Sequence, residues 1–133
     1  MCGIAGIIAE KSISEETIKL MVGEITHRGP DDDGFLIEEK FAFGMRRLSI
    51  IDLSKGHQPI SNEDGTVTIV FNGEIYNFQT LRSEVGDYPF SSKTDTEVLI
   101  ALYIKFGSSM LEKLEGMFAL AIWDSIEETL FLA

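Results

Sequence analysis

The cysteine at position 2 is the residue of this chain best suited to nucleophilic chemistry. Removal of Met1 by an aminopeptidase would leave Cys2 with a free α-amine beside its thiol. The amine titrates near ~7.7–8.0 and the thiol near ~8.5, so the amine can accept the thiol proton close to neutral pH. Because a thiolate is a strong nucleophile, one residue could supply both the nucleophile and the base for acyl transfer. These residues alone leave open the alternative that Cys2 is a small buried hydrophobe.

An acyl-transfer site also needs donors for an oxyanion and groups that hold the substrate. Asn72 and Gly73 follow a predicted strand, where an amide and a backbone N–H could reach one oxygen, although such a dipeptide is also typical of a hairpin turn. One guanidinium of Arg46 and Arg47 could bind a carboxylate in bidentate fashion, and we expect the other to be a solvated charge at the sheet edge. Asp95 could hold an ammonium group or simply cap a helix.

Composition limits the partners and the chemistry. The net charge of −11 over 133 residues argues against nucleic acid and membrane surfaces as partners. The single cysteine excludes an intramolecular disulfide and fits a reducing compartment, so we expect a cytoplasmic protein. One cysteine and two histidines form no recognisable zinc-binding pattern, and the sequence contains no glycine-rich phosphate loop. The chemistry must therefore come from side chains and backbone.

Hydrophobic periodicity predicts the elements that would position these groups. Strands are expected near 3–9, 34–38, 41–50, 66–71, 117–123 and 129–133. Helices are expected over 15–26, 77–85, from Thr94 or Asp95 to about 106, and near 109–114. Several strands are apolar on both faces and the helices come in two batches. This pattern favours one domain, residues 1–133, with an α+β fold: a four-layer α/β/β/α sandwich of two mainly antiparallel sheets.

Six motifs, in this order along the chain, resemble one family. They are M-C-G-I-x-G, H-R-G-P-D, R-R-L-S-I-I-D, F-N-G-E-I-Y-N, T-D-T-E and G-M-F-A-L-A-I-W-D. Together they resemble the N-terminal glutaminase domain of glutamine-hydrolysing asparagine synthetases, which is a class II amidotransferase of the N-terminal nucleophile (Ntn) hydrolase type. The resemblance extends over residues 1–133.

The resemblance implies a role for each matched residue. Cys2 matches the nucleophile, its α-amine the general base, and Asn72 and Gly73 the oxyanion hole. The glutamine-binding positions that it implies are Arg47, Leu48, Ser49, Ile50, Ile51, Asn72, Gly73, Glu74 and Asp95. Arg47 would bind the α-carboxylate, the backbone of 48–51 would line the pocket, and Glu74 and Asp95 would recognise the α-ammonium group. The 28–30 loop is expected to be architectural.

The resemblance also implies a reaction and its partners. The chain would hydrolyse the glutamine amide through a Cys2 thioester and supply ammonia to an asparagine-forming synthetase domain or subunit. No cofactor or metal is expected in this domain, because ATP and Mg belong to the synthetase domain. A homodimer is left open. We also expect the family's domain to continue beyond residue 133, and activity to require removal of Met1.

Three alternatives remain at this point. The first is an amidotransferase for another acceptor, such as a surface-polysaccharide sugar, because only the synthetase half would differ. The second is a non-catalytic regulatory domain that binds glutamine without hydrolysing it. The third, a self-processing hydrolase of the same broad fold, is the least favoured because only one residue precedes Cys2.

Overall fold

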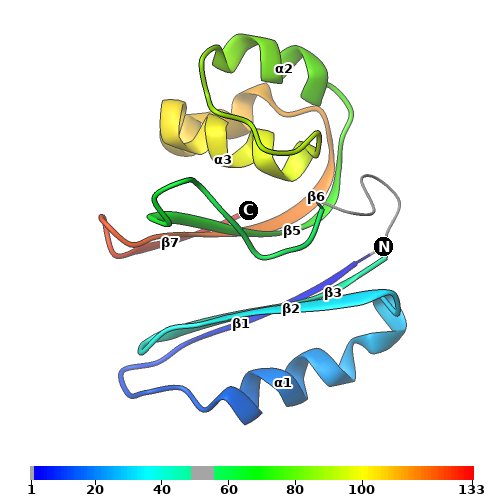
Figure 1. Ribbon diagram of the computed structural model, residues 1–133, viewed down its shortest axis with the longest axis vertical. Helices are drawn as coiled ribbons and strands as arrows, with labels where there is room; N and C mark the ends of the chain where they lie inside the picture. The colour runs from blue at the N-terminus through cyan, green and yellow to red at the C-terminus, as the bar shows by residue number, and fades with distance from the viewer. Residues whose placement is uncertain (1, 49–55) are drawn as a thin grey trace. The chain divides into compact units, whose positions relative to one another are not determined.

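A computed structural model describes residues 2–48 and 56–133 and divides the chain into two compact units, 1–59 and 60–133 (Figure 1). Each unit consists of one antiparallel sheet with helix on one face. The predicted pocket backbone of Ser49, Ile50 and Ile51 lies outside the described residues.

The first unit contains one helix and a three-stranded sheet. Its elements are β1 (Gly3–Ile8), α1 (Glu15–Glu24), the short 3-10 helix η1 (Thr26–Arg28), β2 (Asp32–Ile37) and β3 (Phe41–Arg47). The strand order is β1-β3-β2, and both pairings are antiparallel. β3 is therefore the central strand, and both β1 and β2 pair with it.

Helix α1 covers one face of this sheet (Figure 1). Its buried Ile18 and Val22 lie four residues apart on one side of the helix and pack against Ala42 of β3. Successive side chains of a strand point to opposite faces, and the side chains of β3 that alternate with Ala42 are buried too, namely those of Phe41, Phe43 and Met45. Side chains on both faces of β3 are therefore buried.

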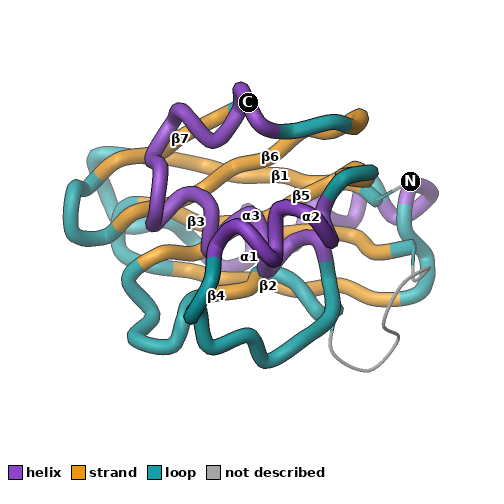
Figure 2. Tube along the Cα trace, turned by 90° about the horizontal axis from the view of Figure 1, so that it is seen from above, coloured by secondary structure: helices purple, strands orange, loops and turns teal. Residues whose placement is uncertain are grey.

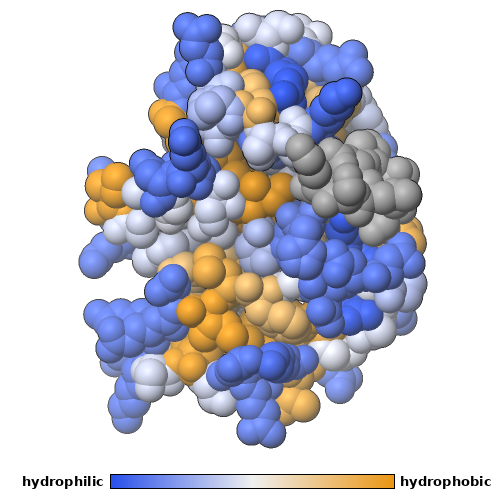
Figure 3. Space-filling view, in the orientation of Figure 1, coloured by the Kyte–Doolittle hydropathy of each residue, from blue (hydrophilic) through white to orange (hydrophobic). Residues whose placement is uncertain are grey.

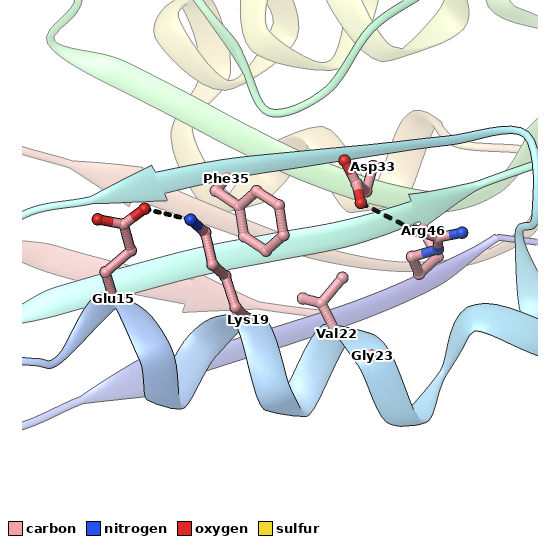
Figure 4. Close-up of a pocket in the computed structure, with 7 residues that line it drawn as sticks. All are labelled: Glu15, Lys19, Val22, Gly23, Asp33, Phe35 and Arg46. Carbon is pink, nitrogen blue, oxygen red and sulfur yellow. Dashed lines mark hydrogen bonds and ion pairs between the residues drawn. The ribbon is translucent and has the colours of Figure 1, made fainter.

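A shallow groove runs between α1 and the edge strand β2 (Figure 4). Val22 and Phe35 form its apolar floor, and its charged side chains lie in pairs, Lys19 with Glu15 and Arg46 with Asp33. The guanidinium of Arg46 and the carboxylate of Asp33 are 2.9 Å apart. None of the predicted site residues is among those that line this groove, so it is not the candidate active site.

The second unit contains the longer strands and two α-helices. Its elements are β4 (Ile60–Ser61), β5 (Val67–Ile75), α2 (Phe78–Val85), α3 (Asp95–Phe106), the 3-10 helix η2 (Gly107–Lys113), β6 (Gly116–Asp124) and β7 (Thr129–Leu132). The sheet order is β4-β5-β6-β7, with antiparallel pairing throughout, and these strands run beside one another in Figure 2. Both α-helices lie on the same face of the sheet (Figure 1).

The core of this unit lies between the helices and the sheet. The buried side chains of β5 and β6 that point toward the helices are Val67, Ile69, Phe71, Ile75, Leu120 and Ile122. They pack against Leu81 of α2 and against the almost wholly buried first half of α3. The apolar periodicity of these segments correctly predicted the helices and most of the strands.

Three predicted boundaries were wrong. β2 begins at Asp32, within the segment that we expected to be a loop, because Asp32 and Asp33 pair with the end of β3. β5 continues to Ile75, so 72–74 lie inside a strand and not beyond its end. The predicted helix near 109–114 is a 3-10 helix over Gly107–Lys113. The strand errors share a cause: the pairing partner is remote in sequence, so local pattern does not reveal it.

The surface is predominantly hydrophilic on the face seen in Figure 3, with smaller apolar patches between charged side chains. Within 2–48 and 56–133, no helix has the length and apolar character needed to cross a bilayer. The same ranges contain no group of three or more His, Cys, Asp or Glu side chains arranged to hold a metal ion.

Gly44 provides a test of the packing of α1 on β3. A Cβ atom at Gly44 would lie 2.3 Å from Cγ2 of Val22, a β-branched side chain with little rotamer freedom. We expect Gly44→Ala to lower the free energy of unfolding by about 1–3 kcal/mol, because α1 must move away from the sheet. Urea unfolding followed by circular dichroism measures the change.

Gly23→Ala is the matched control on the helix side. No atom lies within 4 Å of a Cβ placed at Gly23, so this change should raise the free energy of unfolding by roughly 0.5–1 kcal/mol through helix propensity. If Gly44→Ala were as stable as the parent chain, α1 would not be packed against β3 as closely as described.

Candidate active site

The predicted nucleophile lies at the start of β1 and contacts the residue that follows β3. The N–H of Leu48 points at the thiol of Cys2, with 3.4 Å between nitrogen and sulfur, and the Leu48 carbonyl oxygen is 3.8 Å from the same sulfur. Cys2 is partly exposed. The position is compatible with attack on a small molecule.

The register of β1 and β3 places Cys2 beside Arg47. Gly3 pairs with Arg46, so continuing the antiparallel register by one residue places Cys2 opposite Arg47. Arg47 is 6% exposed, and a buried guanidinium is suited to binding a carboxylate in fixed geometry. The first unit therefore brings together the predicted nucleophile, the predicted carboxylate-binding residue and Leu48.

Arg46 points to the opposite face from Arg47 and has structural partners. Its Nε donates a 2.9 Å hydrogen bond to the carbonyl oxygen of Gly29, and its Nη1 lies 2.9 Å from Oδ2 of Asp33. Only 14% of the Arg46 side chain is exposed. The expectation that the second arginine is a solvated charge at the sheet edge was wrong, because the 28–30 loop crosses that face and supplies acceptors.

Arg28, from the same loop, contacts the predicted nucleophile. Its Nε donates a 3.2 Å hydrogen bond to the carbonyl oxygen of Cys2. The sequence analysis assigned this loop an architectural role without finding this contact. The two residues are 26 positions apart, and no local pattern indicates that they meet; only the H-R-G-P-D motif identified the loop as unusual.

The second unit supplies the other predicted site residues from the last part of β5. Alternation along the strand puts Asn72 and Glu74 on the face away from α2 and α3, with Gly73 between them on the helix face. A Cβ at Gly73 would lie 2.3 Å from the Met117 carbonyl oxygen and 2.6 Å from Cα of Phe118. Only glycine allows β6 to approach this closely.

The side-chain carbonyl oxygen of Asn72 has no partner within the described part of the protein. Its Oδ1 is buried and has no hydrogen-bond partner within the described part of the chain. Leaving a buried polar atom unpaired costs about 1–3 kcal/mol, so this side chain is not held there for stability. An unpaired buried acceptor at a suspected site is compatible with a residue that meets a ligand or water there.

Asp95 is the first residue of α3, and its carboxylate is buried near the end of β5. Its Oδ2 accepts a 3.2 Å hydrogen bond from the N–H of Ile75, and its Oδ1 accepts one of 2.9 Å from Thr96. Burial raises the pKa of Asp95, and the nearby Glu74 carboxylate raises it further. Two neighbouring carboxylates, one of them buried, favour a bound cation such as an ammonium group.

Thr94, and not Asp95, caps the helix. The Thr94 hydroxyl accepts a hydrogen bond from the N–H of Glu97, so the interpretation of Asp95 as a mere cap was wrong. Sequence analysis also missed Glu97, whose buried carboxylate organises the preceding loop. The spacing Thr-x-x-Glu is the capping-box pattern and could have drawn attention to it.

Comparison with known proteins identifies the family. Residues 1–133 match the model of a protein family described as "Glutamine amidotransferase domain". Asparagine synthetase [glutamine-hydrolyzing] 1 of Bacillus subtilis (strain 168) is 46% identical over 138 residues, which cover 98% of this chain and 22% of the relative. Asparagine synthetase B [glutamine-hydrolyzing] of Escherichia coli (strain K12) is 42% identical, covering 94% of this chain and 23% of the relative.

A solved structure supports the same grouping at the level of the fold. Glutamine phosphoribosylpyrophosphate amidotransferase from B. subtilis, complexed with ADP and GMP, superposes with a TM-score of 0.75 at 20% identity, over 98% of this chain and 36% of that one. The likeness confirms the predicted class, α+β with two mainly antiparallel sheets. The chain spans less than a quarter of the length of the two synthetases it matches. Over its whole length, this chain belongs to the glutamine amidotransferase domain family.

Proposed function

We propose that this chain hydrolyses the side-chain amide of L-glutamine to glutamate and ammonia, with Cys2 as the nucleophile. The observation that carries the proposal is the position of the Cys2 thiol, which lies against Leu48 and opposite Arg47. A nucleophile and a buried cation side by side suit a substrate with a reactive group a few bonds away from a carboxylate. Glutamine is such a substrate.

The remaining residues match the other groups of glutamine. The substrate is a zwitterion with a primary amide, so it needs one cation, at least one anion and two oxyanion donors. Arg47 would bind the α-carboxylate, and Asp95 with Glu74 the α-ammonium group. The raised pKa of Asp95 supports this assignment, because a bound cation would stabilise the ionised carboxylate that burial disfavours. Asn72 and Gly73 would donate to the oxyanion.

The reaction proceeds through a thioester. The α-amine of Cys2 takes the thiol proton, and the thiolate adds to the amide carbon to give a tetrahedral oxyanion, which the Asn72 amide and the Gly73 N–H stabilise. The carbon–nitrogen bond then breaks, and the leaving nitrogen takes the proton from the α-amine to depart as ammonia. Water, deprotonated by the same amine, adds to the thioester, and its breakdown releases glutamate and restores the thiol.

The ammonia has a proposed acceptor. Because the relatives named above are asparagine synthetases, we propose that it passes to a synthetase domain or subunit that forms asparagine. The glutaminase step itself uses only side chains and backbone and needs no cofactor, whereas ATP and Mg would serve the synthetase. A cytoplasmic site of action fits the single cysteine, and the net charge of −11 argues against nucleic-acid and membrane partners.

The first test of the proposal is an intact mass measurement with a diazo-ketone analogue of glutamine. We expect chains that have lost Met1 to gain the mass of one inhibitor adduct, and to release glutamate from glutamine, because the free amine then activates Cys2. Chains that retain Met1 should gain none, since their Cys2 nitrogen is in a peptide bond. Cys2→Ala is the control and should stay unmodified. An adduct on Cys2→Ala, or glutamate release by that variant, would rule out the proposed nucleophile.

Asn72 tests the oxyanion hole. We expect Asn72→Ala to lower kcat by about 10²–10³-fold, because one donor to the developing negative charge is lost. Glutamine affinity, measured at equilibrium in a Cys2→Ala background, should change little, since the oxyanion exists only during reaction. Turnover close to that of the parent chain would remove Asn72 from the oxyanion hole.

Arg47 tests recognition of the α-carboxylate. We expect Arg47→Lys to raise KM for glutamine by about tenfold and to affect kcat less, because a point charge replaces a bidentate fork. Arg46→Lys is the matched control and should leave KM unchanged, since Arg46 already bonds to Gly29 and Asp33. The opposite pattern, with KM raised only in Arg46→Lys, would transfer the carboxylate role to Arg46.

A further inference from the structure

A buried carboxylate, that of Glu97, lies in the first turn of α3, two residues after Asp95. Glu97 is only 4% exposed, and its oxygens accept four hydrogen bonds from two adjacent serines. Oε1 accepts from the N–H and the hydroxyl of Ser91, at 2.7 and 3.0 Å, and Oε2 accepts from the N–H and the hydroxyl of Ser92, at 2.7 and 2.6 Å. The Glu97 side chain thus restrains the backbone of the 91–92 segment through hydrogen bonds.

The same network continues to the helix cap. The hydroxyls of Ser92 and Thr94 are 2.9 Å apart, and the Thr94 N–H donates to the Ser92 hydroxyl at 3.3 Å. Thr94 in turn accepts the N–H of Glu97 at 3.3 Å. The hydrogen bonds therefore run from Glu97 to the loop and back to Glu97, and the backbone between Ser92 and Glu97 has little freedom.

Asp95 lies inside this closed network. Its carboxylate reaches from the start of α3 to the N–H of Ile75 on β5, the residue next to Glu74. A 3.2 Å hydrogen bond from Ile75 connects Asp95 to the strand that carries the other predicted site residues of this unit, so the position of Asp95 depends on where the loop places the first residue of α3.

We propose that Glu97 is a positioning residue for the ammonium-binding part of the site: it fixes the 91–94 segment so that the Asp95 carboxylate is held beside Glu74. The inference rests on the proposed function, because it assigns to Asp95 the recognition of the substrate α-ammonium group. Glu97 does not touch the substrate in this assignment. It acts through the loop and the first residue of α3.

The ionisation of Glu97 agrees with this role. Burial by itself raises the pKa of Glu97, but the hydrogen bonds from Ser92 and Ser91 outweigh that effect and leave the pKa below its ordinary value. Glu97 is therefore a carboxylate at neutral pH, and both of its oxygens act as acceptors. A glutamine side chain at this position has the same shape but presents an NH₂ group where one acceptor oxygen is needed.

A purely structural role for Glu97 makes a different prediction from a positioning role. General loosening of the second unit would weaken the binding of any ligand that uses the site. Misplacement of Asp95 would weaken only ligands that carry the α-ammonium group. The compound 4-carbamoylbutanoate, which is glutamine without its amino group, separates the two cases.

The experiment is equilibrium binding by titration calorimetry, with chains that lack Met1 and carry Cys2→Ala to prevent turnover. The ligands are L-glutamine and 4-carbamoylbutanoate, and the variants are Glu97→Gln, Asp95→Asn and Glu112→Gln. Glu112 is exposed and lies on η2 of the same unit, so it controls for the loss of one carboxylate. Circular dichroism checks that each variant is folded.

We expect Glu97→Gln to lower the affinity for glutamine by about tenfold, as Asp95→Asn does, and to leave the affinity for 4-carbamoylbutanoate unchanged. Glu112→Gln should change neither affinity. If Glu97→Gln does not fold, Ser92→Ala replaces it, because that change removes one hydroxyl donor and keeps the backbone N–H; it should show the same selective loss.

Three results would overturn the inference. Equal weakening of both ligands in Glu97→Gln would reduce Glu97 to a stabilising residue. Unchanged glutamine affinity in Glu97→Gln, with a loss in Asp95→Asn, would show that Asp95 keeps its place without Glu97. Failure of the parent chain to bind glutamine at all would refute the proposed function itself, and this outcome is distinct from the other two.

Discussion

The pairing of β1 with β3 is the constraint on which the candidate site depends. It sets Gly3 opposite Arg46, and so decides which of two consecutive arginines lies beside Cys2. A shift of the register by one residue would exchange the faces on which Arg46 and Arg47 lie. The buried side chains on both faces of β3 oppose such a shift, because it would place Phe43 and Met45 under α1, where only Ala42 and Gly44 leave space. The packing of the core thus determines which of the two arginines lies beside Cys2.

Much of the fold could be predicted because its signals are local. The hydrophobic periodicity that predicted α1 and β3 extends over about ten residues in each case, and each element exists near its predicted position. The ends of the strands were less accurate. β5 runs through Asn72 to Ile75 because Gly116 and Phe118 of β6 are available to pair with it, more than 40 residues further along the chain. Nothing near Asn72 in the sequence reveals that partner.

The site residues divide in the same way. Residue type alone identified Cys2 and suggested an arginine, but it did not distinguish Arg47 from Arg46; the family motif did. Arg28 was found only in the structure, because its bond to the carbonyl of Cys2 joins a loop to a strand that is distant in sequence. The motif indicated that the loop matters, and the three-dimensional arrangement gives the physical reason: the loop forms hydrogen bonds with both Cys2 and Arg46.

Asp95 and Glu97 are two buried carboxylates whose surroundings shift their pKa values in opposite directions. Both are buried, both lie in the first turn of α3, and burial opposes the ionisation of each. Glu97 receives four hydrogen bonds, which outweigh the effect of burial and lower its pKa. Burial raises the pKa of Asp95 and the Glu74 carboxylate raises it further, and the hydrogen bonds from the N–H groups of Ile75 and Thr96 offset this only in part. The protein satisfies the charge of Glu97 itself, whereas under the proposed function a bound substrate cation would stabilise the charge of Asp95.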